Sequence, residues 1–200
     1  MTSKLPYAIK NNSVLKFICI LFFGFFFSSL NAQVTIATED WSANNYTSGT
    51  GWTGDWVEAD DDDNATTNTG KIFINAGELD MQGVGEAWLG RVVNVSAYSS
   101  AILNFTFRCA GDMENDDFMF IEYTPDLGAN WFIIDTFQGD TASSGNLVMC
   151  PNPDNVNSGT YSGSFPANGG ANTAIRFRSN ISAADEDFFI DNITVQGVTQ

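Results

Sequence analysis

The sequence predicts an all-β domain of the sandwich or barrel type, and three observations support this. Short apolar or alternating runs recur along the chain, clusters of Gly, Asn, Asp and Ser separate them, and a helical period is nearly absent. Short alternating runs with frequent turn signals are typical of such β proteins. Beyond residue 32 the chain has 168 residues, which is enough for one domain with a full core.

The first 32 residues have the pattern of a signal peptide. Lys4, Lys10 and Lys16 form a positive region, an apolar run (FICILFFGFFF, 17–27) follows, and small residues suit cleavage after Ala32. The apolar run is too short to span a membrane. We therefore expect 1–32 to be removed. Residues 33–200 would then be a secreted or cell-surface domain without membrane insertion.

Eleven runs in the remaining chain are rich in the β-branched and aromatic residues that favour strands. Pro125, Asp126 and Gly128 supply the turn chemistry of a hairpin between two of them. The expected strands are 33–39, 54–58, 71–75, 78–81, 87–95, 101–109, 117–124, 131–137, 159–165, 173–179 and 187–196.

Alternation assigns inner and outer faces to several strands. In 173–179 the apolar residues point inward, and Arg176 and Arg178 point outward. In 117–124 Met119, Ile121 and Tyr123 point inward, which leaves Asp117 and Glu122 in water. These assignments predict a core built from one face of each strand.

The last expected strand has two polar residues, Asp191 and Asn192, in its middle (DFFIDNITV, 187–195). Strict alternation places a polar residue among apolar neighbours on either face. If the alternation shifts by one residue at this pair, four apolar residues all point inward: Phe188, Ile190, Ile193 and Val195. A β-bulge produces such a shift and re-aims a side chain. Asp191 is therefore either a tolerated outward residue or a carboxylate that a bulge points at a partner.

Composition limits the possible chemistry. The absence of histidine removes Ser-His and Cys-His catalysis and His-ligated metal sites. Residues 33–200 contain five basic and 24 acidic residues, so their net charge is −19. This charge argues against nucleic acid and anionic membranes as partners, and it suits divalent cations. Paired carboxylates are the only catalytic resource, so we expect no enzyme, with a carboxylate-based glycan-active enzyme as the less favoured alternative.

Two cysteines, Cys109 and Cys150, follow the expected signal peptide. In an oxidising compartment they predict one disulfide, and the alternative is a pair of free thiols. A bridge closing a loop of this length typically adds about 2–4 kcal/mol of stability.

Several acidic segments could hold Ca²⁺, which takes about six to eight oxygen ligands. The candidates are 38–40, 60–63, 112–117 and 185–192. The run at 60–63 lacks the Gly and Glu of an EF-hand loop, which favours a solvated loop. The segment at 112–117 has the composition of a polar turn between two strands.

Four segments together carry a resemblance to a known module. They are ATEDW followed by GW, RVVNVSAYSSAILNFTF (91–107), DFMFIEYTPDLGANWFIIDTFQG (117–139), and TAIRFRSN followed by EDFFIDNITV. They resemble the opening, middle and closing strands of the MAM-like or galactose-binding-like jelly-roll module of secreted bacterial proteins. PDLGAN stands where that family usually has Asp-Gly-Gly, a departure that affects only the turn. The resemblance implies a two-sheet antiparallel jelly-roll sandwich whose first and last strands lie close together.

The same resemblance implies a structural Ca²⁺ where the first and last strands meet. Its ligands would be Glu39, Asp40 and Asp191, with Asp187 as a further candidate. The alternative is that Asp191 accepts hydrogen bonds from a neighbouring strand or an Arg side chain.

The resemblance further implies binding and not catalysis. We expect a secreted module for a carbohydrate or a cell-surface ligand. The alternative is an adhesion or structural subunit of a larger extracellular or outer-membrane assembly. Trp52 and Trp56 flank a Gly-rich turn (TSGTGWTGDW) and are the expected aromatic platforms for the ligand, whereas Trp131 is expected to be packed. Exposure of Trp52 and Trp56 would favour the carbohydrate ligand.

Overall fold

The computed structural model describes residues 32–65, 70–111, 113–139, 145–149 and 158–199. These residues form twelve strands and one short 3₁₀ turn, η1 (Gly170–Asn172). The strands are β1 (Gln33–Glu39), β2 (Trp52–Ala59), β3 (Ile72–Asn75), β4 (Glu78–Gln82), β5 (Gly85–Val93), β6 (Ser100–Ala110), β7 (Phe118–Thr124), β8 (Phe132–Gln138), β9 (Leu147–Val148), β10 (Ser158–Pro166), β11 (Ala174–Ile181) and β12 (Asp187–Val198).

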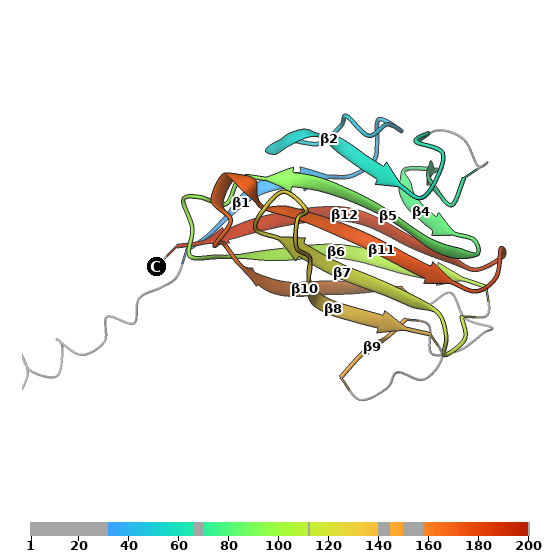
Figure 1. The fold of residues 1–200 in the computed structure, drawn as a ribbon. Helices are drawn as coiled ribbons and strands as arrows, with labels where there is room; N and C mark the ends of the chain where they lie inside the picture. The colour runs from blue at the N-terminus through green and yellow to red at the C-terminus, as the bar shows by residue number, and fades with distance from the viewer. Residues whose placement is uncertain (1–31, 66–69, 112, 140–144, 150–157, 200) are drawn as a thin grey trace, which may run out of the picture. The chain divides into compact units, whose positions relative to one another are not determined.

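The strands form two sheets packed face to face. Sheet A has the order β10-β6-β12-β4-β3, with β1 also paired to β12, and sheet B has the order β2-β5-β11-β7-β8-β9. The named strands pair antiparallel except β8 and β9, which run parallel. In Figure 1, β11 and β7 of sheet B lie in front of β12 and β6 of sheet A. The predicted two-sheet jelly-roll sandwich is confirmed.

All eleven predicted strands are present, with ends that differ by at most two residues. The prediction missed β9, which has only two residues, both of them exposed. So short a segment lacks the alternation from which a strand is predicted, and its pairing with β8 decides its structure.

Aromatic side chains from both sheets meet in the core. Phe105 of β6 packs edge-on against Phe177 of β11, with ring centroids 5.4 Å apart. Phe137 of β8 and Phe188 of β12 lie 5.5 Å apart. All four side chains are 2 % exposed or less. Since such rings bury large apolar areas, these contacts across the sheets supply much of the hydrophobic stabilisation.

The predicted break in the last strand is confirmed. The register between β12 and β6 shifts between Asp191 and Thr194, and Asn192 has a φ of 51°. The four apolar residues on either side of the break are fully buried: Phe188, Ile190, Ile193 and Val195. At the same point the other neighbour of β12 changes from β4 to β1. The bulge therefore keeps one apolar face inward while the strand changes partner.

Two predictions fall on residues outside those described. Residues 1–31 contain most of the expected signal peptide, and Cys150 is half of the expected disulfide. Cys109 is buried, and its sulfur lies 3.2 Å from the carbonyl oxygen of Met149, the residue before Cys150. The signal peptide and the disulfide stay predictions. In the part of the chain that the structure describes, no helix is long and apolar enough to cross a membrane.

The left-handed conformation of Asn192 gives a test of the bulge. A β-branched residue in this region is strained by about 1–2 kcal/mol, whereas glycine adopts it freely. We expect Asn192→Val to unfold at lower urea than Asn192→Gly, by about that free energy. Both variants lose the Asn192 side-chain bonds to Asp191 and Thr106, so their difference isolates the backbone. Equal stability of the two variants would contradict the assignment.

Candidate functional site

Glu39, the first predicted calcium ligand, lies in a buried ion pair. Its Oε2 is 3.1 Å from Nη1 of Arg91, and the two side chains are 0 % and 5 % exposed. Trp56 Nε1 also donates to Oε2, over 3.1 Å. Oε1 accepts from Ser48 Oγ at 2.7 Å and from the backbone N–H of Trp41 at 3.2 Å. Both carboxylate oxygens are thus satisfied by protein donors, which differs from the predicted calcium role.

The other three predicted ligands do not join Glu39 in a cluster. Asp40 accepts two hydrogen bonds from Ser42. The Asp191 carboxylate accepts from the backbone and side chain of Asn192. Burial raises the pKa of Asp191, and Asp40 is among the acids whose charge adds to this rise. In the parts of the chain that the structure describes, no three of the four predicted residues bring their carboxylate oxygens together.

Trp52 and Trp56 are not the open platform that the sequence suggested. Trp56 is only 3 % exposed, and Trp52 is half-buried with its Nε1 donating to the Thr38 carbonyl over 2.9 Å. Their ring centroids lie 5.0 Å apart, and the Arg91 guanidinium lies 5.6 and 5.7 Å from them. The Gly-rich turn folds both rings over the Arg91–Glu39 pair, so the prediction for Trp56 is wrong.

Another aromatic pair, Trp88 and Trp131, stays partly open on the outer face of sheet B. Their ring centroids lie 6.2 Å apart at an interplanar angle of 50°. The guanidinium of Arg176 lies 4.1 Å from the Trp131 ring and 5.4 Å from the Trp88 ring. Gly90 leaves room for this arrangement, because a Cβ there would lie 3.0 Å from the Cβ of Arg176. We call Trp88, Trp131 and Arg176 the aromatic–arginine cluster.

Glu122 fixes the arginines of this face. It is 4 % exposed and Asp117 is 0 % exposed, so the prediction that these two acids lie in water is wrong. The Glu122 carboxylate accepts from Arg176 Nε at 2.6 Å and from Arg178 Nη2 at 3.0 Å. Burial acts to raise the pKa of Glu122, but the hydrogen bonds and charges of Arg178 and Arg176 outweigh it and lower the pKa. The long side chains that point outward from β11 cover this carboxylate, which strand alternation alone does not reveal.

A cavity of about 190 Å³ opens beside the aromatic–arginine cluster. Trp88, Trp131, Asp55, Val57 and Leu127 are among the residues that line it. Val57 and Leu127 are 57 % and 62 % exposed. This surface combines open aromatic and aliphatic groups with one carboxylate and a fixed guanidinium, which suits a ligand with apolar faces and hydroxyl groups.

Sequence reasoning missed this cluster, although a signal was present. Strand alternation places Trp88 on the outward face of β5. A large aromatic residue is unusual there unless other side chains cover it or it binds a ligand. The same alternation places Arg91 on the apolar phase between Leu89 and Val93, which requires a buried acidic partner.

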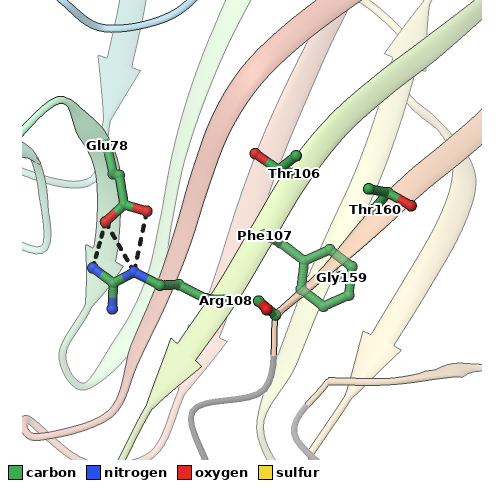
Figure 2. Close-up of a pocket in the computed structure, with 7 residues that line it drawn as sticks. Glu78, Thr106, Phe107, Arg108, Gly159 and Thr160 are labelled. Carbon is green, nitrogen blue, oxygen red and sulfur yellow. Dashed lines mark hydrogen bonds and ion pairs between the residues drawn. The ribbon is translucent and has the colours of Figure 1, made fainter.

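The outer face of sheet A has a different character. A cavity of about 510 Å³ there is lined by Glu78, Arg108, Thr106 and Thr160, among others. Figure 2 shows the Glu78 carboxylate and the Arg108 guanidinium pointing toward each other, with two hydrogen bonds from Arg108 Nε of 2.9 and 3.1 Å. The side chains are 28 % and 31 % exposed, so this ion pair is in contact with solvent and contributes little to stability.

Two acidic groups lie in loops predicted as cation candidates. They are Glu58 with Asp61 and Asp62, and Glu114 with Asp116 and Asp117. In the first, Asp61 accepts from the backbone N–H groups of Lys71 and Ile72 over 2.5 and 2.6 Å. In the second, Asp117 accepts from the backbone N–H groups of Glu114 and Ser182 over 2.6 and 2.7 Å. These bonds show that both groups hold loop backbone in place.

Comparison with one solved adhesin domain supports the fold. No protein-family model matches the chain, and no curated protein matches it. The K3 adhesin domain of Lys-gingipain from Porphyromonas gingivalis matches with a TM-score of 0.53 and 10 % identity, over 82 % of this chain and 99 % of that one. The xylan-binding module CBM15 matches with a TM-score of 0.49 and 10 % identity, over 85 % of this chain and 99 % of that one. The CBM22-1 xylan-binding domain of Paenibacillus barcinonensis Xyn10C matches with a TM-score of 0.48 and 11 % identity, over 85 % of this chain and 98 % of that one.

At these identities the likeness concerns the fold alone. It agrees with the predicted two-sheet jelly-roll fold. The MAM-like name finds no support among these matches.

The buried ion pair predicts a large loss of stability. Glu39→Gln leaves the Arg91 charge buried without its counter-ion, so we expect the free energy of unfolding to fall by about 3–5 kcal/mol. In a double-mutant cycle with Arg91→Met, measured by urea unfolding, the double variant should lose much less than the sum of the single losses. Additive losses would show that the two side chains do not stabilise each other.

Two buried acids predict a pH dependence. Burial, together with the neighbouring carboxyls of Asp61 and Glu114, raises the pKa of Glu58 and of Glu186 from 4.5 to about 7. The folded state binds these protons more tightly, so their stabilisation is complete below about pH 4 and is lost as the pH rises through about 7. In EDTA we expect the melting temperature to fall from about pH 5 to about pH 8. Glu58→Gln with Glu186→Gln should make this slope shallower, and an unchanged slope would contradict the assignment.

Proposed function

We propose that this protein is a secreted, non-catalytic module that binds carbohydrate on the outer face of sheet B. The aromatic–arginine cluster of Trp88, Trp131 and Arg176 carries the proposal, because it is partly open and borders a cavity of about 190 Å³. The segment 1–32, with the pattern of a signal peptide, supports export.

The chemistry of the cluster fits a sugar ring. The rings of Trp88 and Trp131 offer apolar surfaces for the C–H faces of a sugar, and each has a polar N–H at its edge. Arg176 can donate to hydroxyl groups, and Asp55 at the cavity wall can accept from them. Glu122 already holds Arg176, so little side-chain entropy is lost when a ligand binds.

The charge of the chain narrows the ligand class. A net charge of −19 over residues 33–200 repels polyanions at long range. We therefore propose a neutral glycan and not an acidic polysaccharide. The likeness to the K3 adhesin domain is one of fold, so the proposal depends on the side chains of this chain.

A protein partner is the second candidate, and several exposed apolar residues of sheet B favour it. Leu127, Phe132 and Ile133 of the β7–β8 hairpin are 62 %, 48 % and 56 % exposed. Leu147 and Val148 of β9, at the edge of sheet B, are 38 % and 40 % exposed. Exposed apolar side chains at the hairpin and on the edge strand suit an adhesion or structural subunit of a larger extracellular assembly.

The carbohydrate proposal predicts that the indole rings of Trp88 and Trp131 supply much of the affinity for the glycan. On a glycan array, the protein should bind neutral glycans, and Trp88→Ala or Trp131→Ala should weaken the best of them by about tenfold or more. This corresponds to about 1.4 kcal/mol for the loss of one stacking surface. Isothermal titration calorimetry with that glycan measures the change in Kd.

Phe132→Ala is the matched control. Phe132 is an exposed aromatic residue next to Trp131, its ring packs on Tyr123 at 5.5 Å, and it does not line the cavity. This variant should retain glycan affinity. An array without any bound glycan would refute the carbohydrate proposal. Binding that survives both tryptophan substitutions would refute the site.

A further inference from the structure

On the outer face of sheet A, two aspartates from distant parts of the chain lie side by side. β4 and β12 pair antiparallel, with Asp187 opposite Gln82 and Phe189 opposite Asp80. Asp80 and Asp187 are therefore diagonal neighbours on one face and interact directly. Asp80 is 2 % exposed, and Asp187 is half-buried.

Asp80 has a buried oxygen without a partner. Its Oδ2 accepts a long hydrogen bond of 3.3 Å from Asn75 Nδ2, whereas Oδ1 is buried and has no hydrogen-bond partner in the described chain. The nearby guanidinium of Arg108 is engaged by Glu78 and lies 3.4 Å over the Phe189 ring. An unpartnered buried carboxylate oxygen beside a second carboxylate is costly, and the charge of Arg108, which acts to lower the pKa of both acids, offsets only part of that cost.

The protonation behaviour agrees with this geometry. Burial first, and then the charge of Asp187, raises the pKa of Asp80 to about 7. Burial also raises the pKa of Asp187. Two carboxylates that lie diagonally on one face, one of them 2 % exposed with an unpartnered oxygen, are the groups whose charge a bound cation would offset.

The surroundings contain a set of oxygen ligands. Asp80, Asp187, Asn75 and Gln82 line a cavity of about 320 Å³, and the rings of Phe73 and Phe189 form the rest of its wall. Both phenylalanines are nearly buried, at 6 % and 5 % exposure, so they limit access of water to the carboxylates. Carboxylate and amide oxygens without sulfur or imidazole are the donors that Ca²⁺ prefers.

We propose that Asp80 and Asp187, with the side-chain amides of Asn75 and Gln82, form a Ca²⁺ site on the outer face of sheet A. The amide of Asn75 can turn its oxygen toward the ion, because the two ends of an amide are nearly equal in size. The bound ion would join β12 to the β3–β4 hairpin, and this role is independent of the carbohydrate proposal.

This site differs from the calcium site expected at the junction of the first and last strands. Asp187 lies on the part of β12 that pairs with β4, whereas Asp191 lies at the bulge where β1 replaces β4. One predicted ligand is thus retained, but its partner is Asp80, which was not among the predicted ligands.

Calorimetric titration of Ca²⁺ into the purified, EDTA-treated protein tests the proposal. We expect saturable binding that raises the melting temperature, and Asp80→Asn or Asp187→Asn should weaken it by about tenfold or more, because each removes one ligand charge. Without metal, Asp80→Asn should melt at or above the temperature of the unaltered protein, since it removes repulsion within the pair. That result would separate loss of the site from misfolding.

Asp191→Asn and Asp40→Asn are the matched controls, since they remove one charge each at the strand junction. Both should keep the Ca²⁺ affinity, and Trp131→Ala should keep it too, which separates this site from the glycan face. Absence of Ca²⁺ binding to the unaltered protein would overturn the proposal. Binding that survives Asp80→Asn, or that is lost in Asp191→Asn, would also overturn it.

Discussion

The buried ion pair between Glu39 and Arg91 is the interaction on which the arrangement of the two sheets depends most directly. Glu39 ends β1 in sheet A, and Arg91 lies in β5 of sheet B, so the pair joins the sheets across the core edge. Two buried charges are tolerated only with full hydrogen bonding, and Trp56, Ser48 and the Trp41 backbone supply it. The whole segment between β1 and β2 is therefore folded around this pair, which also sets the start of β2 at the edge of the outer face of sheet B.

Within sheet A, the bulge in β12 sets which strands pair with each part of β12. Because the strand changes neighbour at Asp191 and Asn192, its first part can pair with β4 and its second part with β1. Without the extra residue, either Phe188 and Ile190 or Ile193 and Val195 would turn outward. The same local irregularity keeps the core apolar and brings Asp187 beside Asp80.

The two outer faces consequently have opposite chemical character. Sheet B presents Trp88, Trp131 and arginines that Glu122 holds in place, whereas sheet A presents acids beside Phe73 and Phe189. Since the faces lie on opposite sides of the sandwich, a ligand on one would not compete for space with an ion on the other. An ion on sheet A would act on the stability of the fold, while the face of sheet B would recognise the ligand.

The sequence by itself determined eleven of the twelve strands that the structure describes, most of their inward faces and the break at Asp191 and Asn192, because these features depend on local alternation over a few residues. Only the tertiary structure decided that Glu39 pairs with Arg91, that Trp56 is buried, and that Trp88 meets Trp131 and Arg176. The tertiary structure also decided that Asp80 and Asp187 lie side by side. Each of these contacts joins residues from different strands or loops, so it depends on strand order and on how the turns fold back, which local alternation does not encode.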